Sequence, residues 1–246
     1  MTQPWPHSRI IAHRGGGALA PENTLAALRK ARALGFSAVE FDVMLTADRV
    51  PILIHDETLE RTTNGRGAVA GTPYAALAML DAGAWHGAQF RGERVPSFEQ
   101  AAKLCVELEL WANVEIKPAA GHARETGALA AKIAAEIWRD GNETPLLSSF
   151  EPEALEAARE AAPQLPRGFL TDRVSGDWRA SMERYACVSL NCNQAHLTEA
   201  RAREVREAGY WLLCYTVNDP DVARRLFGWG VDAIFTDRLD LIPPDF

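Results

Sequence analysis

Short apolar runs alternate with longer segments of helical spacing along almost the whole chain, and this alternation constrains the fold more than any other feature. Eight runs are predicted to be β-strands, because each is short, largely apolar and bounded by turn residues. These runs are residues 8–13, 38–45, 111–116, 145–150, 167–170, 187–190, 211–217 and 232–235. A further extended run at residues 50–55 is expected to form a hairpin beside the second strand.

Segments with helical spacing separate the strands, and strands that alternate with helices are typical of a parallel sheet. The predicted helices are residues 22–34, 97–108, 126–138, 152–161, 197–207 and 220–227. The chain has 246 residues, which suits one (β/α)8 barrel. No GxGxxG turn leads into a helix, and this argues against an open dinucleotide-binding sheet. The sequence therefore predicts an α/β fold, a TIM (β/α)8 barrel, with residues 1–246 as a single domain.

Residues 56–96 interrupt this rhythm after the second strand. The segment is too long for an ordinary connection between a strand and a helix, and it is rich in Gly, Thr and Arg with little periodicity. We expect a small insertion that lies over one end of the barrel without forming a separate domain.

The formal net charge of -7 argues against nucleic acid as a partner, because binding to a phosphate backbone usually needs a basic face. A small anionic substrate remains compatible with a locally positive site. The chain shows no signal-peptide pattern at its start and no apolar run of about 18 residues. We therefore expect a cytoplasmic protein without stable membrane association, whose oligomeric state the sequence leaves open. The cysteines are expected to be buried, reduced thiols: Cys105, Cys187, Cys192 and Cys214.

Acidic side chains occupy alternate positions on two neighbouring predicted strands. Glu40 and Asp42 share one face of the second strand, and Glu115 shares a face with Lys117 on the next. Three carboxylates at the carboxyl end of a barrel would repel one another, and one hard cation relieves that repulsion. Oxygen ligands favour Mg²⁺, Ca²⁺ or Mn²⁺ over zinc. The alternative is an ion-pair network with Arg14 and Lys117 and no metal.

Two histidines follow apolar runs close to these carboxylates. His13 ends the first strand, and His55 ends the extended run beside the second strand. A pair of this kind fits a general acid and a general base, although ordinary structural histidines would show the same spacing. Arg14 and Lys117 are the predicted contacts to phosphate oxygens, and a surface ion pair is the other reading of Arg14.

Other polar residues near these motifs receive simpler interpretations. Asn23 or Thr24 is predicted to cap the first helix and to do nothing else. The remaining histidines belong to no constellation, and we expect them to be structural or exposed: His7, His86, His122 and His196.

Taken together, the motifs resemble the glycerophosphodiester phosphodiesterase family in their order and spacing. The motifs are His13-Arg14-Gly15, Pro21-Glu22-Asn23-Thr24, Glu40-Phe41-Asp42, His55-Asp56 and Glu115-Ile116-Lys117. The segment from Leu59 to Gly65 looks like the start of the insertion that is characteristic of the family. The chain is especially similar to the compact cytoplasmic bacterial enzymes that accompany glycerol-3-phosphate uptake.

The resemblance implies a TIM barrel that hydrolyses glycerophosphodiesters, such as glycerophosphocholine or glycerophosphoethanolamine, to sn-glycerol 3-phosphate and an alcohol. It implies one divalent cation, Mg²⁺ or Ca²⁺, and a small-molecule substrate as the partner. The attacking oxygen is either the glycerol 2-hydroxyl, which gives a cyclic phosphate, or water. The sequence leaves both routes open, together with the headgroup preference.

Residue roles follow from the matching positions in the family's motifs. Glu40, Asp42 and Glu115 resemble metal ligands, His13 and His55 the acid/base pair, and Arg14 and Lys117 phosphate contacts. Glu22 matches an active-site glutamate. Tyr215 stands where many members have Trp, and an aromatic ring there is expected to pack on the glycerol.

Three other functions compete with this interpretation. A metal-dependent lyase or aldolase acting on a keto acid would also use carboxylates, but it has less need of two histidines beside basic residues. A noncatalytic phosphate-binding barrel would not need both histidines. A lipid-active phosphodiesterase would need a membrane-docking surface, and no basic amphipathic helix or exposed apolar run predicts one.

Overall fold

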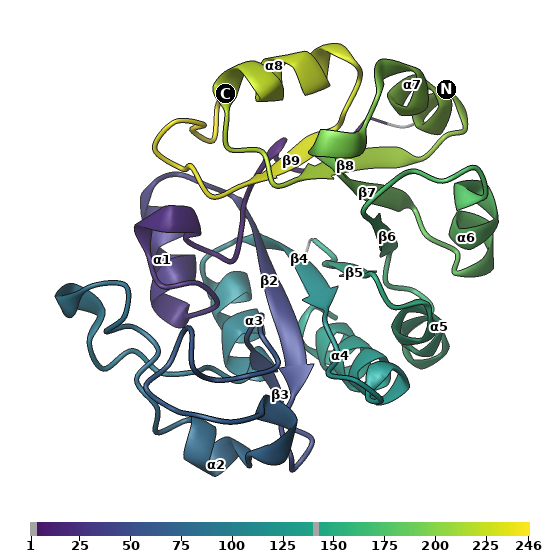
Figure 1. The fold of residues 1–246 in the computed structure, drawn as a ribbon. Coiled ribbons are helices and arrows are strands. Elements are labelled where there is room, and N and C mark those ends of the chain that lie inside the picture. Colours follow the sequence, from purple (N-terminus) through teal and green to yellow (C-terminus); the bar gives the residue numbers. More distant parts are fainter. Residues whose placement is uncertain (1–3, 140–142) are drawn as a thin grey trace.

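The computed structural model describes residues 4–139 and 143–246, in which eight parallel strands close into a barrel surrounded by helices (Figure 1). The barrel strands are β1 (Ile10–Ala12), β2 (Ala38–Leu45), β4 (Trp111–Ile116), β5 (Leu146–Ser149), β6 (Arg167–Thr171), β7 (Ser189–Asn193), β8 (Trp211–Tyr215) and β9 (Ala233–Thr236). They pair in chain order, and the ring is closed because β1 pairs in parallel with both β9 and β2. The predicted TIM barrel is confirmed.

The strands are connected by helices that lie on the outside of the barrel. The helices are α1 (Leu25–Ala33), α3 (Phe98–Glu107), α4 (Ala123–Ile137), α5 (Pro152–Ala161), α6 (Trp178–Arg184), α7 (Glu199–Glu207) and α8 (Pro220–Gly228). Helix α3 begins at a complete capping box, in which Ser97 and Gln100 each satisfy a backbone N–H of the other. Thr24 caps α1 by accepting from the backbone N–H of Ala27 at 3.2 Å.

Most elements differ from the predicted ranges by up to three residues at an end, but the differences at β7 and α6 are of another kind. Strand β7 covers Ser189–Asn193, whereas the apolar run predicted residues 187–190. The carboxyl half of β7 contains the polar residue Asn191, which is buried inside the barrel. A search for apolar runs therefore ends the strand too early. Cys187 instead lies in the turn after α6, and its backbone N–H donates to the carbonyl of Met182. Helix α6 itself lies outside the predicted helical ranges.

The short strand β3 (Pro51–Leu53) pairs antiparallel with the end of β2, as expected for the hairpin. The segment that follows carries η2 (Val69–Gly71), α2 (Tyr74–Leu77) and η3 (Ala88–Phe90), and Figure 1 shows it beside the β2–β3 hairpin. Leu59, Val69 and Leu77 from this segment are buried with Met44 and Ile52 of the hairpin in a small apolar cluster. Residues 56–96 thus pack on the barrel edge, while their status as an insertion within one domain stays a prediction.

Strand β2 shows how the barrel separates apolar from polar chemistry. Val39, Phe41 and Val43 point outward into the core shared with the helices, and the Phe41 ring lies 6.1 Å from that of Phe98 on α3. Because side chains alternate along a strand, Glu40 and Asp42 point into the barrel. The outward packing of three apolar residues therefore fixes the direction of two carboxylates.

The amino end of the barrel interior is filled with apolar side chains. Trp111 of β4 and Ala233 of β9, each the first residue of its strand, belong to this inner cluster. Trp5, from the segment before β1, packs edge-on against Trp111 at 5.4 Å and Trp211 at 5.2 Å. The filled amino end places the polar interior residues toward the carboxyl end of the strands, where barrel enzymes carry their sites.

All four cysteines are buried and free, which confirms the prediction of reduced thiols. Among the residues that the structure describes, no helix has the length and apolar character needed to cross a membrane.

Replacement of Phe41 by Ala should destabilise the protein by about 3–5 kcal/mol, because it leaves a cavity between β2 and α3. Urea unfolding followed by circular dichroism measures the change. Val106→Ala on the exposed side of α3 is the control, and we expect it to change the free energy of unfolding by less than about 1 kcal/mol. Equal effects of the two substitutions would contradict the outward packing of β2.

Candidate active site

A cavity of about 240 Å³ opens at the carboxyl end of the barrel strands. It brings together every predicted site residue except Glu22. The lining residues are His13, Arg14, Glu40, Asp42, His55, Asn113, Glu115, Lys117, Phe150, Leu170, Tyr215, Thr216 and Phe235.

Three carboxylates meet in this cavity from the neighbouring strands β2 and β4. Glu40, Asp42 and Glu115 each offer an oxygen, and these oxygens all lie within 4.8 Å of one another. Glu40 and Asp42 are only 3% and 2% exposed. In the parallel register Asp42 lies opposite Glu115, so the pairing of the two strands itself places these acids side by side.

Burial changes the protonation of this cluster. Burial raises the pKa of Glu40 well above its usual value, and the carboxylates of Asp42 and Glu115 raise it further. Burial and Asp42 likewise raise the pKa of Glu115 to about 8. Three negative charges therefore do not coexist here near neutral pH without a counter-charge.

The nearby basic residues compensate this charge incompletely. The Nε atom of Arg14 lies 3.7 Å from Asp42, and the Nζ atom of Lys117 lies 3.6 Å from Glu115, both longer than a direct charged hydrogen bond. Glu40 Oε2 accepts from the backbone N–H of Arg14 at 2.9 Å, but its buried Oε1 has no hydrogen-bond partner among the residues that the structure describes. An all-oxygen cluster with an orphaned buried oxygen fits a hard divalent cation better than a complete ion-pair network.

His13 is oriented by an acid from the last strand end. Its Nδ1 atom lies 2.6 Å from Oδ1 of Asp237, and its Nε2 atom lies 3.7 Å from Oε2 of Glu40. Asn218 holds Asp237 by donating to Oδ2 at 3.0 Å and by accepting from the Asp237 backbone N–H at 2.8 Å. Although burial opposes it, the hydrogen bond with His13 keeps the pKa of Asp237 below its usual value. A carboxylate only accepts, so Nδ1 carries the proton and Nε2 faces the acid cluster.

His55 has the same arrangement on the opposite side. Its Nδ1 atom lies 2.7 Å from Oδ1 of Asp56, which in turn accepts two hydrogen bonds from Arg61. The bonds from Arg61 hold the pKa of Asp56 below its usual value. Burial lowers the pKa of His55 despite the opposing effect of the nearby acids, so its neutral form is favoured near pH 7.

Arg14 reaches the cavity from a tight turn after β1. Its backbone has a φ of 50°, and Gly17 in the same turn has a φ of 52°. A Cβ atom at Gly17 would overlap the backbone of Asp237, so glycine is needed for the turn to pack against the end of β9. Glu22 accepts from Arg14 at 2.7 Å but does not line the cavity, and it therefore lies behind the arginine.

Part of the cavity wall is aromatic. The rings of Phe150 and Tyr215 meet edge to face with centroids 5.7 Å apart. The Tyr215 hydroxyl donates to the carbonyl of Thr171 at 2.9 Å, which leaves the ring as the surface offered to the cavity. The site thus has one charged wall and one aromatic wall.

The prediction that Asn23 only caps a helix is wrong. It donates to Oδ2 of Asp42 at 2.8 Å and accepts from the Asp42 backbone N–H at 3.1 Å, while Thr24 alone caps α1. Asn23 adopts a φ of 58°, which turns its side chain toward β2. The cap signature at residues 21–24 does not distinguish these two roles.

Other site residues were outside the predicted set. Asn113 shares the inward face with Glu115, and the alternation that revealed Glu115 was sufficient to find it. Arg61 and Asp237 lie in segments, Leu59–Gly65 and Thr236-Asp237, that resemble those of the family, but the sequence does not reveal their contacts. Asp237 meets His13 only when the barrel closes, and Arg61 meets Asp56 only when residues 56–96 fold.

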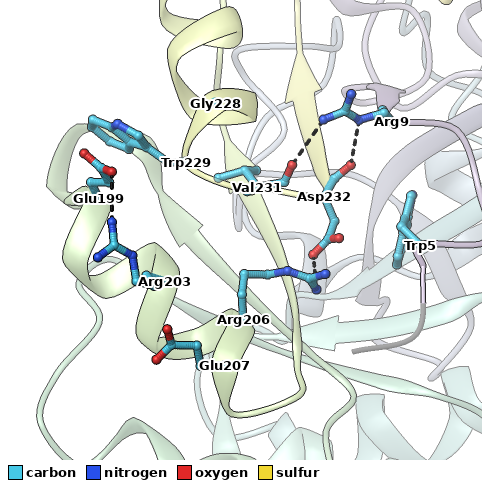
Figure 2. Close-up of a pocket in the computed structure, with 11 residues that line it drawn as sticks. Trp5, Arg9, Glu199, Arg203, Arg206, Glu207, Gly228, Trp229, Val231 and Asp232 are labelled. Atoms are coloured by element: carbon cyan, nitrogen blue, oxygen red, sulfur yellow. Dashed lines mark hydrogen bonds and ion pairs between the residues drawn. The ribbon is translucent and has the colours of Figure 1, made fainter. Parts of the chain in front are cut away.

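A separate groove of about 520 Å³ lies at the amino end of the strands (Figure 2). Its arginines face acids of the same groove: Arg206 lies 2.6 Å from Asp232, and Arg203 lies 3.2 Å from Glu199. These internal ion pairs, together with the distance from the histidines and the acid cluster, leave the smaller cavity as the candidate active site.

The sequence pattern of the Glycerophosphoryl diester phosphodiesterase family matches residues 13–241, which include the acid cluster and both histidines. The chain belongs to this family. It is therefore an enzyme of the phosphoric diester hydrolase class, as the motifs predicted.

Individual relatives match almost end to end. The glycerophosphodiester phosphodiesterase of Caldanaerobacter subterraneus subsp. tengcongensis is 33% identical, and the match covers 93% of each chain. A solved structure of an Oleispira antarctica phosphodiesterase, in complex with the product sn-glycerol-3-phosphate, has 35% identity and a TM-score of 0.88 over 93% of this chain and 92% of that chain. The Agrobacterium tumefaciens glycerophosphodiester phosphodiesterase structure has 28% identity and a TM-score of 0.75 over 95% and 98% of the two chains.

The raised pKa of Glu115 predicts a pH-dependent response to divalent cations. Between the usual pKa of 4.5 and about 8, Glu115 of the folded metal-free protein keeps a proton that the unfolded chain has lost, so the contribution of this group to stability should fall as pH rises through that window. A cation replaces those protons, and the increase in Tm caused by Mg²⁺ or Ca²⁺ should therefore be larger near pH 8 than near pH 6.

Thermal unfolding with chelator or with added cation measures this difference, and Glu115→Gln serves as the matched control. The substitution should reduce both the pH dependence and the cation response. A cation-induced Tm shift that is the same at both pH values in the wild-type protein would contradict the protonation assigned to the cluster.

Proposed function

We propose that this enzyme hydrolyses glycerophosphodiesters to sn-glycerol 3-phosphate and an alcohol, with one divalent cation and a pair of histidines. The observation that carries the proposal is the presence of three clustered carboxylates and two imidazoles in one cavity. Family membership supports the reaction class, and the sn-glycerol-3-phosphate in the Oleispira antarctica relative supports the product.

Glu40, Asp42 and Glu115 are the proposed ligands of the cation, Mg²⁺ or Ca²⁺. When bound, the cation supplies a Lewis acid that neutralises charge developing on the phosphate. Asn23 would keep Asp42 oriented through its two hydrogen bonds. Arg14 and Lys117 are the proposed contacts to the phosphate oxygens, with the guanidinium able to offer two parallel N–H groups.

The two histidines are the proposed acid and base. The hydrogen bonds at Nδ1 to Asp56 and Asp237 leave both Nε2 atoms for the substrate. His55 is favoured as the initial base, since burial lowers its pKa and keeps it neutral. Its Nε2 atom would take the proton of the attacking oxygen, and His13, protonated at both ring nitrogens, would give its Nε2 proton to the departing alcohol. Reversal of these roles completes a second step if the first forms a cyclic phosphate.

The aromatic wall is the proposed surface for the glycerol moiety. Tyr215 has its hydroxyl engaged with the Thr171 carbonyl, so it would contact the substrate through its ring. Glu22 is better placed to position Arg14 than to contact the substrate itself.

A coupled assay for glycerol 3-phosphate released from glycerophosphocholine and glycerophosphoethanolamine tests the reaction. We expect glycerol 3-phosphate release that stops with a chelator and returns with added Mg²⁺ or Ca²⁺. The cluster of buried acids carries negative charge, so a cation is needed before the anionic phosphate of the substrate can bind beside it. Activity that survives exhaustive chelation would remove the cation from the proposal. Pyruvate release from keto acids without phosphodiester cleavage would favour the lyase alternative.

His13→Ala and His55→Ala should each reduce kcat by about a hundredfold or more, the lower range for loss of a general acid or base. The matched control is His122→Ala, which removes a half-exposed imidazole near the start of α4 that does not line the cavity. Its kcat should stay within about twofold of wild type. Either active-site variant turning over within about tenfold of wild type would exclude that histidine from acid/base catalysis.

A further inference from the structure

Arg61, from the first turn of residues 56–96, lies between two acids that serve different parts of the candidate active site. Its Nη1 and Nη2 atoms donate to the two carboxylate oxygens of Glu22 at 2.6 and 2.9 Å. Its Nε and Nη2 atoms donate to Asp56 at 2.5 and 3.0 Å. The guanidinium thus makes two bidentate contacts, one along each of two edges.

Each of these acids holds a residue that the proposed mechanism uses. Asp56 bonds Nδ1 of His55 at 2.7 Å, and Glu22 accepts from Nη1 of Arg14 at 2.7 Å. A continuous chain of charged hydrogen bonds therefore runs from the proposed base to the proposed phosphate contact, with Arg61 at its centre. The charges alternate along this chain, so removal of the central cation would leave Glu22 and Asp56 without their strongest shared partner.

The local fold holds Arg61 in place. Leu59 is buried, its backbone N–H donates to the Gly67 carbonyl at 3.0 Å, and its own carbonyl accepts from both the N–H and the hydroxyl of Thr63. The turn around Arg61 is therefore anchored on both sides of the arginine, and the guanidinium meets the two acids from a fixed direction.

Because Arg61 is partly exposed, we expect its ion pairs to matter more for the position of the catalytic groups than for the stability of the fold. Its side chain is 44% exposed, and ion pairs at such positions contribute little to the free energy of unfolding. Small displacements of catalytic groups, in contrast, cost much in rate, because proton transfer and phosphate contact depend on close geometry. The effect of its removal should thus be seen in catalysis far more than in folding.

We propose that Arg61 is a positioning residue that couples the proposed base His55 to the proposed phosphate contact Arg14 through Asp56 and Glu22. This inference rests on the proposed function and deepens it. It makes the start of residues 56–96 part of the active site, because the segment supplies the cation that fixes both acids. Lysine cannot replace this arginine, since one ammonium group does not reproduce two bidentate contacts.

The test compares Arg61→Ala, Arg61→Lys and a matched control in the chelator-sensitive glycerol 3-phosphate assay. Arg124→Ala is the control, because Arg124 also bridges two acids, Glu156 and Glu160, but between helices α4 and α5. We expect Arg61→Ala to lower kcat by about tenfold or more and to raise KM, with a Tm close to that of wild type. Arg61→Lys should recover only part of the loss, and added guanidinium ion should partly restore Arg61→Ala.

A double-mutant cycle with Asp56→Asn identifies the path of the effect. If Arg61 acts on His55 through Asp56, the kcat loss from Arg61→Ala should largely disappear in the Asp56→Asn background. Glu22→Gln should account for the change in KM. Additive losses in the cycle, wild-type kinetics in Arg61→Ala, or a loss of activity that matches a loss of folded protein would each overturn the inference.

The outcomes also separate this inference from the proposed function. Wild-type enzyme that releases no glycerol 3-phosphate in the presence of cation would overturn both. An active wild-type enzyme together with a fully active Arg61→Ala variant would overturn the role of Arg61 and leave the proposed function intact.

Discussion

The mutual repulsion of Glu40, Asp42 and Glu115 is the constraint on which the site depends. Each acid is directed into the barrel by apolar neighbours that pack outward, and the register of β2 and β4 brings them together. Without a counter-charge, burial favours their protonated forms, as the raised pKa values of Glu40 and Glu115 show. The packing that stabilises the barrel therefore brings three acids together. Their cluster is electrostatically unfavourable by itself and suited to a hard cation.

Histidines, basic residues and aromatic rings surround the negatively charged acid cluster. His13 and His55 each have a carboxylate at Nδ1, so both rings present Nε2 to the same cavity. Arg14 stands close to the acids but makes its shortest contact with Glu22, which leaves the cluster only partly neutralised. The aromatic wall formed by Phe150 and Tyr215 completes a cavity that can distinguish the charged part of a substrate from its carbon skeleton.

Periodicity made the barrel and the acid cluster predictable from the sequence. The alternation in β2 identified both its extent and the inward face carrying Glu40 and Asp42. The same reasoning fails at β7, because Asn191, which is buried inside the barrel, carries no hydropathy signal. Hydropathy patterns predict the strands and the direction of their side chains reliably where apolar residues are buried on one face and polar residues lie on the other.

Contacts between distant segments were beyond such patterns. Asp237 meets His13 across 224 positions of sequence, and only closure of the ring between β9 and β1 brings them together. Asn23 was expected to cap a helix, yet its left-handed backbone directs the side chain to Asp42. Arg61 contacts Glu22, 39 positions away in the sequence, and Asp56 only in the folded chain. The neighbouring sequence of each of these residues does not indicate the contact that the residue makes in the site.

Anomalous scattering from crystals grown with Mn²⁺ would show whether the three acids bind one cation. Mn²⁺ also prefers oxygen ligands, and its anomalous signal gives its position. We expect one anomalous peak within coordination distance, about 2.0–2.6 Å, of oxygens from all three acids. No peak between them, with the acids turned toward Arg14 and Lys117 instead, would show that the cluster is an ion-pair network and not a metal site.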